Sequence, residues 1–115
     1  MRLVETPLAG PLSERLSQPP GHDLRLWWLG QAGFVVEGEG RRVVIDPYLS
    51  DSLAEKYRGT KFPHVRMMPA PVAAHEVAHV DLVLATHAHT DHLDPGTLPS
   101  LMAASPRALL VPPTA

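Results

Sequence analysis

Apolar and polar positions alternate with a period of two along residues 24–29, and short apolar runs follow at residues 34–37 and 41–45. A period of two is typical of β-strands. The Gly-Glu pair at residues 38–39 predicts a type II′ hairpin turn between the second and third runs. Pro47 closely follows the third run, and proline ends a strand because it has no backbone N–H to donate. The pattern therefore predicts three strands, two of them joined as a hairpin.

The second half of the chain predicts strands that alternate with a helix. Residues 80–86 and 107–111 are mostly apolar, as in strands that are buried on both faces of a parallel sheet. Between them, Asp94 and Pro95 are typical of a helix start, and Pro106 is expected to end this helix. The order β-hairpin, loop, β, loop, α, β predicts an α/β layered fold.

Two stretches lack regular periodicity. Residues 1–23 contain four prolines, so we expect a loosely ordered lead-in with one helical turn, followed by a domain over residues 24–115. Residues 48–79 are also irregular. Within them we expect short helices inside residues 49–57 and inside residues 72–79.

Composition excludes several classes of protein. A chain of 115 residues fits one domain, and its formal net charge of −2 gives no basic excess for binding nucleic acid. Cysteine is absent, which excludes disulfides, thiolate ligands and cysteine nucleophiles. No apolar run approaches the about 18 residues of a membrane span, and the start of the chain has no apolar segment of a secretory signal. We therefore expect a cytoplasmic protein without nucleic-acid or membrane partners.

The candidate chemistry lies in the sequence His-Ala-His-Thr-Asp-His at residues 87–92, directly after an expected buried strand. Loops at the carboxyl ends of strands carry functional groups in α/β sheets. His87 and His89 are two residues apart, so in extended backbone both imidazoles project to one side. Asp91 and His92 can face a second point nearby. Two metals about 3.5–4 Å apart can hold a bridging hydroxide, which is a strong nucleophile.

Two other interpretations of the histidines are open. Exposed loop histidines without function are one, but composition gives a His-x-His-x-Asp-His pattern in only about one chain in a thousand. Residues 75–79 also fit H-E-x-x-H, the signature of a zinc-protease helix, which composition gives in about one chain in fifty. The prolines before it and the strand after it leave room for two helical turns, so we expect His75 and His79 to be surface residues.

The motifs resemble those of the metallo-β-lactamase superfamily. Four residues, His87, His89, Asp91 and His92, are similar to its central metal motif in type, spacing and position after a strand. Asp46, at the end of an earlier strand, resembles the family aspartate that supports the metal loop without binding metal.

A narrower resemblance is to the L-ascorbate-6-phosphate lactonase-like branch of this superfamily. It rests on residues 28–34 (WLGQAGF), 45–52 (IDPYLSDS) and 92–94 (HLD). The resemblance implies the N-terminal half of an αββα sandwich, because the further His, the bridging Asp and the final His of the family lie downstream. We expect either a truncated product or a partner chain that supplies the rest. An exposed sheet edge and apolar face would then favour a homo-oligomer or a complementing chain.

The resemblance implies a metal-dependent hydrolase that acts on a small-molecule substrate. His87 and His89 would bind one divalent metal, and Asp91 and His92 a second, with Zn²⁺ or Mn²⁺ as the ion. Metal-activated hydroxide would attack a lactone or ester carbonyl, and Asp91 is expected to be the catalytic carboxylate. The alternatives are a phosphodiesterase or phospholipase D-like hydrolase of the same fold, and a non-catalytic half-domain with incomplete metal sites.

Two further carboxylates are expected near this site. Asp46 would orient the metal loop, although an aspartate before proline is also typical of a turn. Asp94 either helps at the metal loop or caps the following helix. Four cations in the irregular loop suit a sugar phosphate substrate, or else form a solvated surface; they are Lys56, Arg58, Lys61 and Arg66.

Overall fold

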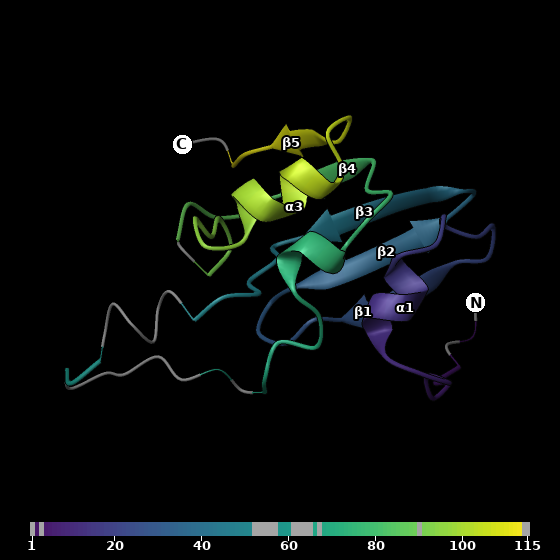
Figure 1. Cartoon of the computed structure of the whole chain (residues 1–115), viewed down its shortest axis with the longest axis horizontal. Helices are drawn as coiled ribbons and strands as arrows, with labels where there is room; N and C mark the ends of the chain where they lie inside the picture. Colours follow the sequence, from purple (N-terminus) through teal and green to yellow (C-terminus); the bar gives the residue numbers. More distant parts are fainter. Residues whose placement is uncertain are drawn as a thin grey trace.

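The computed structural model describes residues 2, 4–51, 58–60, 66, 68–89 and 91–113 (Figure 1). Its described part contains one five-stranded sheet whose strands lie in chain order. The strands are β1 (Arg25–Trp28), β2 (Phe34–Gly38), β3 (Arg41–Ile45), β4 (Leu82–Leu84) and β5 (Leu109–Val111). β1, β2 and β3 pair antiparallel, whereas β3, β4 and β5 pair in parallel. This mixed sheet confirms the predicted α/β fold and the hairpin that precedes the parallel strands.

The turn between β2 and β3 differs from the predicted type. Gly38 pairs with Arg41, so the two turn residues are Glu39 and Gly40. Both have a positive φ, of 52° and 75°, as a type I′ turn requires. The prediction of a type II′ turn was wrong because the glycine that supplies the left-handed conformation is Gly40, two positions after Gly38.

Three short helical segments pack on one face of the sheet in the described part of the chain (Figure 1). They are α1 (Leu12–Leu16), the 3-10 helix η1 (Ala74–Glu76) and α3 (Leu98–Ala104). α1 is the helical turn expected within residues 1–23, and its Leu12 and Leu16 are buried. Of the helix expected within residues 49–57, residues 52–57 lie outside the described residues. No described helix is both long and apolar enough to cross a membrane.

The two helical segments that the structure describes after β3, η1 and α3, are shorter than predicted. η1 keeps only three residues of the region 72–79. α3 begins at Leu98 because a turn precedes it, in which the N–H groups of Thr97 and Leu98 both donate to the carbonyl oxygen of Asp94 at 3.1 and 3.0 Å. Its helical residues end before Pro106, as predicted.

The core lies between these helical segments and the sheet. Val35, Val44 and Val83, from β2, β3 and β4, are fully buried on this face. Leu16 of α1 and Leu101 of α3 are fully buried in the same cluster. The helices therefore cover the inner face of the sheet through aliphatic packing.

The opposite face of the sheet is apolar and is exposed at its two edge strands in the described part of the chain. One row of side chains crosses all five strands in register, and it consists of Trp28, Phe34, Ile45, Leu84 and Val111. At its two ends, Trp28 and Val111 are 44% and 46% exposed. Phe34, Ile45 and Leu84, between them, are half-buried.

The prediction that residues 107–111 form a buried strand was wrong. In β5, Leu109 and Leu110 are 68% and 39% exposed. Among the described residues β5 pairs only with β4. It is therefore an edge strand. In β4, only Val83 is buried. β4 therefore has one covered face, whereas the prediction required two.

A buried charged cluster joins the sheet to two preceding segments. Arg42 and Glu37 are both fully buried, and Nε of Arg42 donates to Oε2 of Glu37 at 2.7 Å. The same guanidinium donates to the carbonyl oxygens of Leu16, Gln18 and Ala78. One arginine of β3 therefore holds the end of α1 and the chain before β4 against the sheet.

Candidate metal centre

The candidate site lies at the carboxyl ends of β3 and β4, which are adjacent parallel strands. Asp46 follows β3 directly, and residues 86–94, here named the histidine loop, follow β4 closely. The N–H of Asp46 donates to the carbonyl oxygen of Leu84 at 2.8 Å, which brings the Asp46 carboxylate beside Thr86. All residues of the histidine loop except Thr90 are described.

The carboxylate of Asp46 contacts the histidine loop at two places. Thr86 donates twice, from its N–H to Oδ1 at 2.7 Å and from its hydroxyl to Oδ2 at 2.6 Å. Nδ1 of His92 lies 2.8 Å from the same Oδ2. Asp46 is 4% exposed and has a φ of +46°, a left-handed conformation that aspartate tolerates better than most residues. The structure thus brings Asp46 and His92 together, as an orienting role of Asp46 requires.

The environment of Asp46 favours its ionised form. Burial raises the pKa of its carboxyl, but hydrogen bonds from the Thr86 hydroxyl, the Thr86 N–H and His92, together with the charge of His92, outweigh it and hold the pKa below the ordinary 3.8. An ionised Asp46 accepts a hydrogen bond from a protonated Nδ1 of His92. This leaves Nε2 as the nitrogen available to a metal. Sequence reasoning missed Thr86, whose only sequence signal is a hydroxyl residue directly before the histidine motif.

Replacing Thr86 with valine is expected to lower the free energy of unfolding by about 1 kcal/mol, because the variant loses a hydrogen bond to a carboxylate. A carboxylate with a lowered pKa contributes stability above its unfolded value of 3.8, and this contribution is lost as pH falls through the folded pKa. The difference between variant and wild type should therefore shrink in acid. Urea unfolding at neutral and acidic pH measures it, with the exposed Thr6→Val as control. An undiminished difference in acid would contradict this account.

The three imidazoles of the histidine loop lie close together. The ring centroids of His87 and His89 are 6.1 Å apart, with the planes within 21° of each other, and those of His87 and His92 are 4.6 Å apart. Oδ2 of Asp91 lies 3.7 Å from Nε2 of His92. Across the described residues, no group of three or more His, Asp or Glu side chains is already arranged to hold one metal ion. The structure therefore gathers the rings as neighbours rather than around one centre.

The chemistry of this donor set nevertheless suits a divalent metal. Imidazole nitrogens and a carboxylate oxygen are ligands that Zn²⁺, Fe²⁺ and Mn²⁺ accept. His87 and His89 are exposed, so an ion can reach them, and His92 is fixed from behind by Asp46. The residues present fit a metal whose remaining ligands come from elsewhere.

Asp94 is fully buried at the end of the histidine loop. Its carboxylate accepts hydrogen bonds from the N–H of Gly96 and the hydroxyl of Thr97, both before α3, and from the hydroxyl of Ser50. The expectation that Asp94 caps the helix was wrong, because the N-cap residue of α3 is Thr97 and Asp94 makes its contacts in the turn before it. Sequence reasoning missed Ser50 and Thr97.

The structure gives Arg66 a different use from the expected one. Its guanidinium donates to the carbonyl oxygens of Leu29, Tyr48 and Met68 and lies 5.0 Å from the centre of the Tyr48 ring. The charge that was expected to meet a phosphate is therefore engaged with the protein backbone. Lys56 and Lys61 lie outside the described residues.

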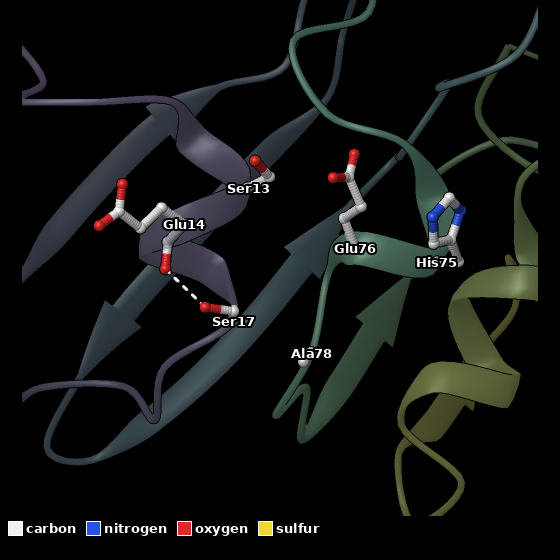
Figure 2. A pocket seen from close by; sticks show the side chains of 6 residues that line it. All are labelled: Ser13, Glu14, Ser17, His75, Glu76 and Ala78. Atoms are coloured by element: carbon white, nitrogen blue, oxygen red, sulfur yellow. Dashed lines mark hydrogen bonds between the residues drawn. The ribbon is translucent and has the colours of Figure 1, made fainter.

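The H-E-x-x-H segment does not form a metal site. η1 ends at Glu76, and His79 lies beyond it with a φ of +56°, so the two histidines do not share a helix face. His75 and Glu76 line a pocket of about 350 Å³ between η1 and α1. Figure 2 shows these two side chains. Glu76 accepts a hydrogen bond from the N–H of Ala73 at 2.8 Å. His75 and His79 are exposed, which confirms their prediction as surface residues.

A mixed sheet with a His-x-His-x-Asp-His loop at the carboxyl end of a parallel strand is typical of the metallo-β-lactamase class of proteins. The family model described as "Beta-lactamase superfamily domain" matches residues 25–112. The chain therefore belongs to the metallo-β-lactamase superfamily.

Several relatives carry names that mention a metal or a hydrolysed substrate. A UPF0173 metal-dependent hydrolase of Aeropyrum pernix is 36% identical over 73% of this chain and 27% of its own length. One of Cupriavidus taiwanensis is 36% identical over 83% of this chain and 29% of its own. The mitochondrial N-acyl-phosphatidylethanolamine-hydrolyzing phospholipase D of Saccharomyces cerevisiae is 39% identical over 58% of this chain and 14% of its own.

A similar solved structure is that of an isothiocyanate hydrolase from Delia radicum gut bacteria. It has a TM-score of 0.53 and 32% identity, covering 76% of this chain and 33% of the hydrolase. The chain thus spans roughly a quarter to a third of the A. pernix and C. taiwanensis relatives and of this solved structure.

Proposed function

We propose that this chain forms the metal-binding part of a metal-dependent hydrolase that acts on a lactone or ester. The observation that carries the proposal is the cluster of three imidazoles at the carboxyl edge of the sheet, with His92 held by the buried carboxylate of Asp46. The names of the two UPF0173 relatives support the same class of reaction.

The residues of the cluster divide the work of binding. His87 and His89 would serve one metal, and Asp91 and His92 a second, with Mn²⁺ or Zn²⁺ as the ion. A bound divalent metal activates water at neutral pH and polarises the carbonyl under attack. Asp46 fixes the ring of His92 through Nδ1, which leaves Nε2 as the nitrogen for a metal. Asp91, near that nitrogen, is the proposed catalytic carboxylate.

A second candidate reaction is phosphodiester hydrolysis. It is favoured by the similarity to the yeast protein that is named a phospholipase D, which is 39% identical over 58% of this chain. The same metal chemistry serves both reactions, because polarisation by a metal assists attack on a carbonyl or on a phosphoryl group.

Turnover assays on the metal-loaded chain test the proposal and separate the two reactions. We expect Mn²⁺ or Zn²⁺ to support hydrolysis of a lactone or a nitrophenyl ester, and a chelator to abolish it. Faster hydrolysis of bis(4-nitrophenyl) phosphate than of either carbonyl substrate would favour the second reaction. Protein that binds neither metal and hydrolyses no substrate would contradict the proposal.

A further inference from the structure

The histidine loop is attached at both of its ends to one short segment, residues 46–50, which follows β3. At the first end, Asp46 accepts two hydrogen bonds from Thr86. At the last end, Ser50 donates its hydroxyl to Oδ2 of Asp94 at 2.7 Å. The described residues of the loop between these points therefore span two anchors, and the first anchor is already part of the proposed site.

The second anchor is a closed set of hydrogen bonds in the protein interior. Asp94 and Thr97 are both fully buried. The hydroxyl of Thr97 donates to Asp94 and accepts from the N–H of Leu49 at 2.8 Å. Thr97 thus bridges the end of the loop to the segment after β3, in parallel with the Ser50 contact.

Packing at this anchor leaves little space for movement. A Cβ atom added to Gly96 would lie 2.7 Å from Oγ and 2.8 Å from Cβ of Ser50. The turn before α3 therefore sits directly against Ser50, and the N–H of Gly96 donates to Oδ1 of Asp94 at 2.9 Å. The anchor is fixed by contact as well as by hydrogen bonds.

We infer that Ser50 and Thr97 are positioning residues for metal binding, an inference that rests on the proposed function. His92 and Leu93 both donate their N–H groups to the carbonyl oxygen of His89, so the loop forms one compact turn just before Asp94. A shift of Asp94 moves this turn, and with it the ring of His92. Ser50 and Thr97 act through Asp94, and neither is proposed to touch metal or substrate.

The test is the affinity of the full chain for Mn²⁺ and Zn²⁺, measured by competition with a chromogenic chelator. Loss of residues that orient metal ligands typically lowers affinity about 10- to 100-fold, and we expect this loss in Ser50→Ala and Thr97→Val. Thr97→Ser keeps the hydroxyl and should stay within about threefold of wild type by the same reasoning.

Ser105→Ala is the matched control. Ser105 is buried at the other end of α3, where its hydroxyl accepts from the N–H of Val80 at 3.0 Å. This variant also removes a serine hydroxyl and one hydrogen bond, so urea unfolding should show a loss similar to that of Ser50→Ala. Its metal affinity should remain that of wild type.

The outcomes separate this inference from the proposed function. Wild-type affinity in Ser50→Ala and Thr97→Val, or an equal loss in Ser105→Ala, would overturn the inference while the proposed function stands. Wild-type protein that binds neither ion would overturn both. Reduced affinity in the two variants, with retention in Thr97→Ser and Ser105→Ala, would support positioning through Asp94.

Discussion

Replacing His87 and His89 together with alanine is expected to abolish binding of Mn²⁺ and Zn²⁺, with a loss of affinity of at least about 100-fold. The two imidazoles lie 6.1 Å apart between ring centroids and are the nitrogens assigned to one metal. They are the ligands that this chain is proposed to give to that metal, and a firm site commonly needs three or four protein ligands, so their loss removes the site. Elemental analysis after dialysis and chelator competition measure the effect.

The chain provides its own control for this experiment. His75 and His79 are also exposed histidines a few residues apart, and they lie on and after η1, outside the histidine loop. Alanine at both positions should leave metal content unchanged. Metal content that survives the loss of His87 and His89, or that disappears with His75 and His79, would show that the site lies elsewhere.

Replacing Arg42 with alanine is expected to lower the free energy of unfolding by about 3–5 kcal/mol. The variant leaves the buried charge of Glu37 without the guanidinium of Arg42. Glu37 would keep Arg15 as a partner at 2.9 Å but would lose Arg42, and three carbonyl oxygens would lose their donor. Single domains are commonly stable by about 5–15 kcal/mol, so this variant approaches unfolding. Urea unfolding followed by tryptophan fluorescence measures the change.

Two variants make the Arg42 experiment specific. Arg41→Ala removes a neighbouring arginine whose side chain is 75% exposed and whose ion pair with Asp81 spans 3.5 Å, so it should cost less than about 1 kcal/mol. Replacing Arg42 and Glu37 together with methionine and leucine should recover part of the loss, because apolar groups can replace a buried ion pair. Equal losses in Arg41→Ala and Arg42→Ala would contradict the assigned role of the buried cluster.

The strands could be predicted from the sequence because their apolar residues alternate with a period of two or form short runs. The hairpin of β2 and β3 and the strand before the histidine motif follow from such short apolar runs. Which face of each strand is buried could not be predicted in the same way. Alternation places Glu37 on the face of Val35 and Arg42 on the face of Val44. Only their ion pair and the carbonyl groups around Arg42 explain why two charged residues are buried there.

The candidate site could also be predicted in part from the sequence. The histidine motif and Asp46 are local signals, and the structure places His92 and Asp46 in contact. The contacts Ser50–Asp94 and Leu49–Thr97 join residues 44 and 48 positions apart. The contacts of Arg66 depend on where three carbonyl oxygens meet. Such contacts depend on the path of the backbone, which the spacing of residue types does not encode.

The uncovered row from Trp28 to Val111 has a practical consequence for anyone who handles this chain. Dyes such as anilinonaphthalene sulfonate report loosened states by fluorescing on accessible apolar surface. Here the folded chain already offers such a surface at both edges of the sheet, because Trp28 on β1 and Val111 on β5 are exposed. Dye fluorescence therefore has a high starting level in the native protein, and unfolding is better followed by circular dichroism.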